Sequence, residues 1–448
     1  MKSNTKVAAT KNFEGVKVAP VKPYDELKRA VLTCLLGEDT YYESGGTVMD
    51  RVKALAETVE PEKVAELAML ARNQFKLRHV PLFLVRTLAK RGYKGTGAVL
   101  QQIIQRPDEI AEFLAMYWKE GKQSISRQVK KGLSAAFNKF NEYSFGKYNQ
   151  DNAIKLRDVL FMVHPKAKDK AQQEIFDKIA NKTLVYPETW EKLLASGADK
   201  KATFEGLMER EELGGLAFLR NLRNMVDAKV DENLLRGYFG KANFSRVLPY
   251  RFITAAKYAP RLEDKLEEGM FKAVEGMKKL EGKTLLVIDV SPSMSAMLSS
   301  KSEMNRLDAA CGLAILAREL CENVEIVTFS NDISVLPNRR GFALRDSIAE
   351  RFRRGNGTQM HLIPAYAKSE GRQFDRTIII TDEESQTPFT YTPEFGELYM
   401  INVSVHKHAI GFGNWVRLSG FSEAILTFIE EYENEQRAKS YADGAIAA

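Results

Sequence analysis

Apolar positions between residues 24 and 279 recur at helical spacing. In the stretch 59–75, Pro61 stands where a helix would start, and Val64, Leu67 and Ala71 fall on one stripe. The same spacing recurs in residues 80–93, 106–121, 124–140, 152–165 and 213–225. Short segments containing Gly, Pro or Asn separate these stretches. The pattern predicts an α-helical repeat array of the HEAT type.

The period changes after Glu281 and Gly282. Short apolar runs rich in β-branched residues follow at 283–289, 323–329, 376–381 and 398–405. Helical stretches lie between and after them, at 306–321, 344–354, 361–370 and 422–436. This alternation predicts a doubly wound α/β domain with buried parallel strands. We therefore expect a flexible basic arm (1–23), a helical array (24–280) and an α/β domain (281–448).

Charge is distributed unevenly between these parts. The chain has 66 basic and 59 acidic residues, a net charge of +7. Residues 1–280 hold 49 basic and 36 acidic residues, a net +13, which leaves 17 basic and 23 acidic residues, a net −6, for the remainder. Residues 51–150 alone carry 18 basic and 9 acidic residues. This distribution favours a polyanionic partner for the array.

Part of this positive charge falls on one predicted helix. Arg127, Lys130 and Lys131 lie within one turn and can share a face. Aromatic residues that could stack on bases are interleaved with the basic ones: Tyr117, Trp118, Phe137, Phe140, Tyr143, Phe145 and Tyr148. Two interpretations stay open, a nucleic-acid surface or a solvated helix face over an aromatic core.

Oxygen-bearing side chains cluster where the predicted strands of the α/β domain end. Asp289, Ser291 and Ser293 follow the first strand, Thr358 follows a Gly-Asn-Gly turn, and Asp382 ends another strand. Loops at the carboxyl ends of parallel strands meet at one edge of the sheet. Carboxylates and hydroxyls suit a hard divalent cation, so we expect Mg²⁺ here. The alternative is a polar cluster that only caps the next helix.

This set resembles the metal-ion-dependent adhesion site (MIDAS) of von Willebrand factor A domains, and the resemblance covers residues 283–435. Pro292 stands where such domains often carry Gly, which stiffens the loop without removing a ligand. A second carboxylate two residues after Asp289, as in a haloacid dehalogenase-like phosphatase, is missing because Ser291 stands there. No phosphate-binding loop, zinc motif or Cys–His pair at a family spacing occurs either. We therefore predict a protein that is not an enzyme.

The cysteines and the targeting segments expected in secreted or membrane proteins bear on the cellular compartment. The three cysteines, Cys34, Cys311 and Cys321, stand among apolar residues and form neither a zinc pattern nor a disulfide framework. The sequence contains no secretory signal and no long apolar run, so we expect a cytoplasmic protein without a membrane partner.

The order of the two domains resembles the Ro autoantigen family, in which a TROVE domain precedes a von Willebrand factor A domain. Four segments carry the resemblance: LLGEDTYY (35–42), KYNQDNAIKLRDVLFMVH (147–164), LAFLRNL (216–222) and LPYRFITAAKYA (248–259). The resemblance covers about residues 24–435. It implies an array closed into a ring, which binds Y-like RNA and the ends of misfolded small RNAs.

The resemblance also implies particular contacts and partners. Lys147 and His164 fall where the family has RNA-contacting residues, and Asp151 replaces a residue that is often basic. Arg127, Lys130 and Lys131 match a basic helix of the family. A monomeric protein in RNA quality control, with an exoribonuclease as partner, is the implied role. The alternative is an interaction scaffold whose metal site binds a carboxylate of a partner protein.

Overall fold

The computed structural model describes residues 10–11, 17–18, 23–33, 45–73, 75, 77–149, 153–185, 190–245, 247, 249–298, 304–383, 385, 387–403, 415–419 and 424–446. The chain divides into two compact units. Residues 22–32 and 47–193 form the array unit, and residues 194–448 together with 1–21 and 33–46 form the C-terminal unit. Asp151, Cys34 and the segment 35–42 lie outside the described residues.

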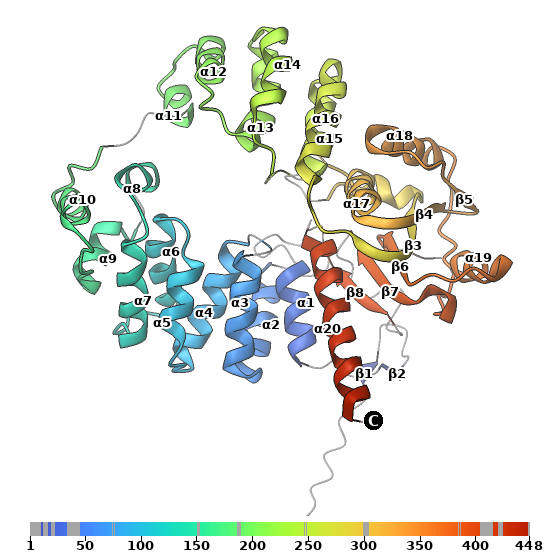
Figure 1. Cartoon of the computed structure of the whole chain (residues 1–448), viewed down its shortest axis with the longest axis horizontal. Helices are drawn as coiled ribbons and strands as arrows, with labels where there is room; N and C mark the ends of the chain where they lie inside the picture. The colour runs from blue at the N-terminus through green and yellow to red at the C-terminus, as the bar shows by residue number, and fades with distance from the viewer. Residues whose placement is uncertain are drawn as a thin grey trace, which may run out of the picture. The chain divides into compact units, whose positions relative to one another are not determined.

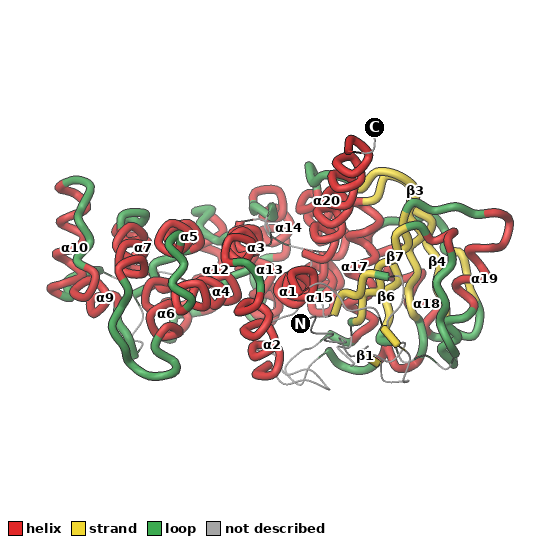
Figure 2. Tube along the Cα trace, turned by 90° about the horizontal axis from the view of Figure 1, so that it is seen from below, coloured by secondary structure: helices red, strands yellow, loops and turns green. Residues whose placement is uncertain are grey.

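The array unit is helical, as the apolar spacing predicts. Its helices are α1 (Pro23–Thr33), α2 (Gly45–Thr58), α3 (Pro61–Asn73), α4 (His79–Lys90), α5 (Thr96–Ile103), α6 (Asp108–Tyr117), α7 (Arg127–Phe137), α8 (Glu142–Tyr148), α9 (Leu156–Val163) and α10 (Lys170–Asn181). Seen end on, α3, α5 and α7 form one layer, and α4 and α6 lie in a second layer (Figure 2). The helices of each layer pack on their neighbours and on the other layer. This two-layer stacking confirms a helical array, while its assignment to the HEAT type stays a prediction.

Two glycines allow the closest approach within this unit. A Cβ atom on Gly132 of α7 would lie 2.8 Å from the carbonyl oxygen of Gly97 in α5. A Cβ atom on Gly97 would likewise lie 2.8 Å from the carbonyl oxygen of Gln128. Only hydrogen atoms fit in this space, so the backbones of α5 and α7 touch. The contact fixes which face of α7 is buried and which is exposed.

The C-terminal unit begins with a second stack of helices. Helix α11 (Trp190–Ala195) crosses the boundary between the units, and the helices that follow are α12 (Lys200–Glu209), α13 (Gly215–Asp227), α14 (Glu232–Lys241), α15 (Pro249–Tyr258) and α16 (Glu263–Val274). Helix α13 packs on α15, and α15 packs on α17 (Arg306–Leu320), which belongs to the α/β part of the chain. Lys257 of α15 forms an ion pair with Asp308 of α17. The last helices of the array and the α/β part therefore form one body.

A six-stranded sheet forms the centre of the α/β part (Figure 1). Its strands, in spatial order, are β5 (Ile333–Val335), β4 (Cys321–Phe329), β3 (Leu280–Asp289), β6 (Arg376–Thr381), β7 (Glu397–Asn402) and β8 (Val416–Ser419). All neighbours are parallel except β5, which runs antiparallel to β4. The four predicted strands are therefore confirmed as β3, β4, β6 and β7. The two edge strands, β5 and β8, were not predicted.

Helices cover both faces of this sheet. Side chains of α19 (Leu362–Lys368) join one apolar layer, in which Ile363 packs with Val287 and Ile379. On the other face, Glu433 of α20 (Ala424–Ile446) accepts hydrogen bonds from Arg376 of β6 at 2.7 Å. Helix α17 packs on β3, β4 and β6, and α18 (Gly341–Phe352) packs on α17. This arrangement confirms the doubly wound α/β fold and places the strand-end loops at one edge.

Near the start of the chain, β1 (Thr10–Lys11) pairs with β2 (Lys17–Val18) in a short antiparallel ladder. Both strands lie within the predicted basic arm, whose flexibility stays a prediction. Among the described residues, no helix is both long and apolar enough to cross a membrane.

Candidate functional site

The structure brings the predicted metal ligands to one edge of the sheet. Asp289 ends β3, and Asp382 directly follows β6, the parallel neighbour of β3. Both carboxylates are fully buried. Thr358 comes from the loop between α18 and α19. This loop lies close to β3, because a Cβ atom on Gly355 would be 2.5 Å from the carbonyl oxygen of Val290.

The loop after β3 presents its hydroxyls together. The hydroxyl oxygens of Ser291 and Ser293 lie 3.1 Å apart. Pro292 starts the 3-10 turn η2 (Pro292–Ser295), which carries Ser293. The fixed φ of proline suits this position, so its presence in place of Gly leaves both hydroxyls available. The loop thus provides two neutral oxygens beside the carboxylate of Asp289.

Internal hydrogen bonds hold the Asp289 carboxylate. The backbone N–H of Ser291 donates to its Oδ1 atom at 2.8 Å, and the hydroxyl of Thr381 donates to its Oδ2 atom at 2.6 Å. Burial, and then the negative charge of Asp382, raise the pKa of Asp289 to about 7. A second buried carboxylate therefore makes ionisation of Asp289 unfavourable, and a bound dication would relieve this repulsion.

One residue of this site escaped the sequence analysis. Arg306, the first residue of α17, places its Nη1 atom 2.7 Å from Oδ2 of Asp382. The same Nη1 atom donates to the carbonyl oxygen of Ser293 at 3.3 Å. The guanidinium thus joins the Asp382 carboxylate to the loop after β3, and the oxygen donors beside it fit a hard divalent cation. Among the described residues, no group of three His, Cys, Asp or Glu side chains offers another metal site.

The predicted basic helix corresponds to α7. Val129, Leu133 and Phe137 are buried on one face, whereas Arg127, Lys130 and Lys131 are exposed on the other. None of these three cations forms an ion pair with a residue that the structure describes. The Ser126 hydroxyl caps the helix by accepting from the N–H of Val129. Helix α7 therefore offers a compact group of unpaired positive charges to solvent.

Lys147 and His164 come from α8 and from the end of α9, helices that follow one another along the chain (Figure 1). Lys147 lies in α8, with its Nζ atom 5.8 Å from the centre of the Tyr148 ring. His164 ends α9 in a left-handed conformation, with φ of 46°, and its side chain is exposed. His is one of the residues that adopt this conformation with little strain. Both side chains can reach a ligand on the surface, and their role in RNA binding stays a prediction.

Most of the interleaved aromatic residues belong to the core. Four of the seven, Tyr117, Phe137, Phe140 and Phe145, are at most 9% exposed. The rings of Phe137 and Phe145 stack at 5.9 Å. These four side chains cannot stack on bases, and the interpretation as an aromatic core is correct for them. Tyr143 differs, with 57% of its surface exposed.

The sequence analysis overlooked an exposed aromatic residue on α9. Phe161 is 48% exposed, and the guanidinium of Arg157 lies over its ring. Leu156, Val159, Leu160 and Val163 of the same helix are buried. Positions 157, 161 and 164 are spaced by four and three residues, so they share the face opposite to the buried one. Helical spacing alone could have identified this basic and aromatic face.

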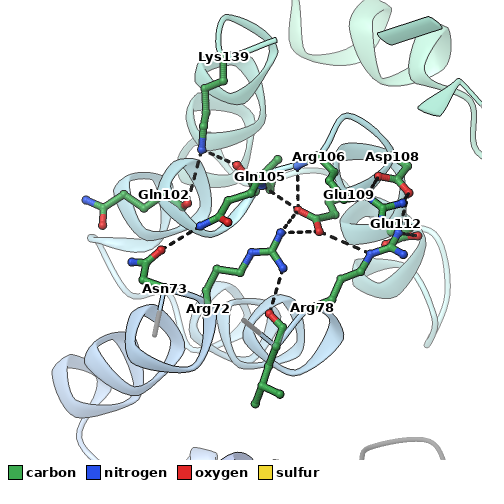
Figure 3. Close-up of polar contacts among 12 residues, drawn as sticks. Arg72, Asn73, Arg78, Gln102, Gln105, Arg106, Asp108, Glu109, Glu112 and Lys139 are labelled. Carbon is green, nitrogen blue, oxygen red and sulfur yellow. Dashed lines mark hydrogen bonds and ion pairs between the residues drawn. The ribbon is translucent and has the colours of Figure 1, made fainter. Parts of the chain in front are cut away.

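Several cations of the array unit are engaged in hydrogen bonds and ion pairs, some of them buried (Figure 3). Arg72 donates to both carboxylate oxygens of Glu109 at 2.6 and 2.8 Å. Arg78 pairs with Asp108 and with Glu112. Lys139 donates to the carbonyl oxygen of Gln101 at 2.7 Å and also to that of Ile104 at the end of α5. The net charge of residues 51–150 therefore exceeds the charge that a ligand could contact. This makes α7 the stronger candidate for an exposed basic surface.

Two family models match adjoining parts of the chain. The TROVE domain matches residues 180–306, and the Ro60 vWA domain matches residues 283–393. Both domains of the Ro family thus occur in the family order, as the sequence segments predicted. The chain thus resembles the Ro family in both of its domains.

One solved structure shares the fold of most of this chain. The crystal structure of the Deinococcus radiodurans RO (RSR) protein superposes with a TM-score of 0.66 at 18% sequence identity. The match covers 90% of this chain and 97% of that chain. An aerotolerance-related membrane protein from Bacteroides fragilis NCTC 9343 matches 27% of this chain and 67% of its own, with 17% identity and a TM-score of only 0.20. No curated protein matches the sequence.

Proposed function

We propose that the protein binds Y-like small RNA and the ends of misfolded non-coding RNAs, and that it acts in RNA quality control. The observation that carries the proposal is the exposed group of Arg127, Lys130 and Lys131 on α7. Unpaired cations on a fixed helix face attract phosphates, and each phosphate contact releases counterions from the RNA. Contacts of this kind do not read sequence, which suits a protein that binds RNAs of different sequence.

Helices α8 and α9 add contacts to bases, which phosphate contacts do not provide. Lys147 and His164 add a cation and a hydrogen-bonding ring, and Phe161 adds an exposed aromatic surface. Unpaired bases stack on such rings, whereas bases inside a duplex cannot reach them. A surface with both features would favour RNAs that combine a stem with an unpaired end. Asp151 would repel phosphate, so its replacement by Arg is expected to tighten binding.

Filter-binding titrations with the full chain test this proposal. The three probes are a stem with a single-stranded tail, the tail alone and a blunt duplex of the same sequence, each at several salt concentrations. We expect the tailed stem to bind most tightly and every affinity to fall as salt rises. The absorbance ratio of the purified protein, with and without nuclease, shows whether RNA copurifies. Absence of binding at low salt would favour the interaction scaffold instead.

For the α/β part we propose a Mg²⁺ site formed by Asp289, Ser291, Ser293, Thr358 and Asp382. The two carboxylates supply charge and the hydroxyls supply neutral oxygens, so water would complete the coordination of the ion. The ion would hold together the loops that follow β3 and β6. We propose no catalytic role for it, since we identify no nucleophile paired with a general base among the side chains that the structure describes at this edge. Turnover of RNA or of a phosphate ester that is lost in Asp289→Ala would contradict this view.

The remaining partners follow from the proposed role. An exoribonuclease that degrades the captured RNA, a monomeric state and a cytoplasmic location all stay predictions, as does closure of the array into a ring. Sedimentation of the purified chain tests the monomeric state. Copurification from cells, with and without nuclease, tests whether a nuclease partner depends on RNA.

A further inference from the structure

The position of the Arg306 side chain in the candidate metal centre has a consequence for metal binding. Its Nη1 atom contacts Asp382, which follows β6, and also the carbonyl oxygen of Ser293 in the loop after β3. The guanidinium therefore bridges the two sides of the proposed ligand set. Arg306 is 7% exposed and Asp382 is fully buried, so water screens this ion pair very little.

The backbone of Arg306 is firmly tied to the same loop. Its N–H donates to the carbonyl oxygen of Ala296 at 2.9 Å, and Asn305 pairs with Met297 in an isolated bridge. Asn305 also caps α17 by accepting from the N–H of Asp308 at 2.8 Å. A change at this site can therefore leave the backbone in place and move only the long side chain.

We propose that Arg306 is a built-in cation of the candidate metal centre, which competes with a divalent cation for Asp382. This inference rests on the metal site proposed above and does not depend on RNA binding. A dication among Asp289, Ser293 and Asp382 would lie within a few ångströms of the guanidinium, and the two positive charges would repel each other. Metal binding therefore requires the guanidinium to leave the carboxylate.

The competition has two effects on the protein. Without metal, Arg306 supplies the positive charge that the buried Asp382 needs, so the loops after β3 and β6 stay joined. With metal, the released guanidinium enters solvent beside the site and becomes available to an acidic group of a partner. The affinity for metal is weakened by the free energy needed to displace the arginine.

Metal titrations of four variants test the competition, with Mg²⁺ followed by calorimetry and Mn²⁺ by electron paramagnetic resonance. We expect Arg306→Gln to bind both ions at least about tenfold more tightly than the wild type, because a neighbouring like charge is removed. Arg306→Lys keeps the charge and should stay close to the wild type. Arg318→Gln is the matched control, since Arg318 lies on the same helix and bonds to Asn338. Asp289→Asn should bind neither ion.

The outcomes distinguish failure of the proposed competition by Arg306 from failure of the proposed metal site. One outcome is that the wild type binds metal while Arg306→Gln binds it equally or less tightly. Arg306 then only positions Asp382 or has no role in metal binding, so the proposed competition is wrong and the proposed metal site is retained. Absence of binding in both proteins removes the metal site as well. RNA titrations of the same samples are expected to be unchanged, which confirms folding and keeps the RNA proposal separate.

A measurement on the wild type covers the case in which Arg306→Gln does not fold. Phenylglyoxal modifies exposed guanidinium groups, and mass spectrometry of the peptide that begins near Met304 reports on Arg306. We expect slow modification without metal and clearly faster modification at saturating Mg²⁺, with Arg318 unchanged. Equal protection of Arg306 in both conditions would show that metal and guanidinium bind together, against competition.

Discussion

The guanidinium carbon of Arg157 lies 4.9 Å from the centre of the Phe161 ring on α9. The Nε atom of Arg157 also donates to the carbonyl oxygen of Ala180 at 2.6 Å, which ties the guanidinium to the end of α10. A fixed cation over an exposed ring is attracted to its π-electrons and holds the ring in one orientation. A ring of this kind, with basic residues around it, is a suitable surface for an unpaired base.

We predict that Phe161→Ala weakens binding of single-stranded RNA. Loss of one stacked base costs roughly 1–3 kcal/mol, about 5- to 150-fold in affinity. The thermal unfolding temperature should barely change, because nearly half of the ring is already in water. Binding of a blunt duplex should be unaffected. Leu216→Ala, an exposed apolar residue of α13, is the control, and equal losses in both variants would contradict a stacking role.

The helices show why some features of the proposed RNA surface were predictable and others were not. Buried apolar spacing identifies α7 and also fixes which of its residues face solvent, so Arg127, Lys130 and Lys131 could be placed from the sequence. Phe161 could have been placed in the same way, because the buried positions Leu156, Leu160 and Val163 put it on the opposite face of α9. The fact that Arg78 and Lys139 are engaged by partners 30 or more residues away could not be derived from local spacing.

We predict that Glu109→Ala destabilises the array unit strongly. Glu109 is fully buried and accepts from Arg72 and from the backbone N–H groups of Gln105 and Arg106. Removal of one partner leaves a buried charge without compensation, which costs roughly 3–5 kcal/mol. Urea unfolding followed by circular dichroism measures the loss. Replacing both partners, in Arg72→Met with Glu109→Leu, should recover most of it, and failure to do so would point to the backbone contacts as the main contribution.

We predict that Mg²⁺ raises the thermal stability of the wild type and not that of Asp289→Asn. The substitution preserves the shape of the side chain and removes a negative charge that the ion needs. Differential scanning calorimetry across a magnesium series, with EDTA as the reference, measures the shift. Asp332→Asn is a matched control, since Asp332 lies in the turn before β5 on the same sheet. Equal shifts in all three proteins would mean that magnesium acts elsewhere.

In the candidate metal centre, the positions of residues at strand ends predicted the two carboxylates but not Arg306. Asp289 and Asp382 could be paired in advance, because parallel strands bring their carboxyl ends to one edge. Arg306 follows Asp289 by 17 residues, across a loop whose path the sequence does not fix. Its long side chain could point into the site or away from it, and contacts across this loop, such as the bridge of Asn305 to Met297, hold the start of α17 beside the site.

We predict that Cys311 and Cys321 do not react in the folded protein. Burial raises the pKa of both thiols, that of Cys311 to about 12. At pH 8 only about one Cys311 thiol in ten thousand would then be a thiolate, the form that attacks a disulfide reagent. A Cys34→Ser variant treated with such a reagent should release no colour until denaturant is added. Rapid labelling of the native variant at pH 8 would show that the sheet and α17 open easily.

We predict that Lys130→Ala with Lys131→Ala weakens all RNAs alike and lowers the salt dependence of binding. Each phosphate contact on single-stranded RNA contributes about −0.7 to the slope of log affinity against log salt, so two lost contacts reduce the slope by about 1.4. Folding should be unaffected, because both side chains are exposed and neither pairs with a described acidic residue. Lys200→Ala with Lys201→Ala is the matched control, since these adjacent lysines are also exposed but lie on α12 in the other unit. Filter binding at four or more salt concentrations measures both variants. If the α7 variant keeps the wild-type slope while the α12 variant loses it, the RNA surface lies on the C-terminal unit, because a slope changes only where phosphates are contacted.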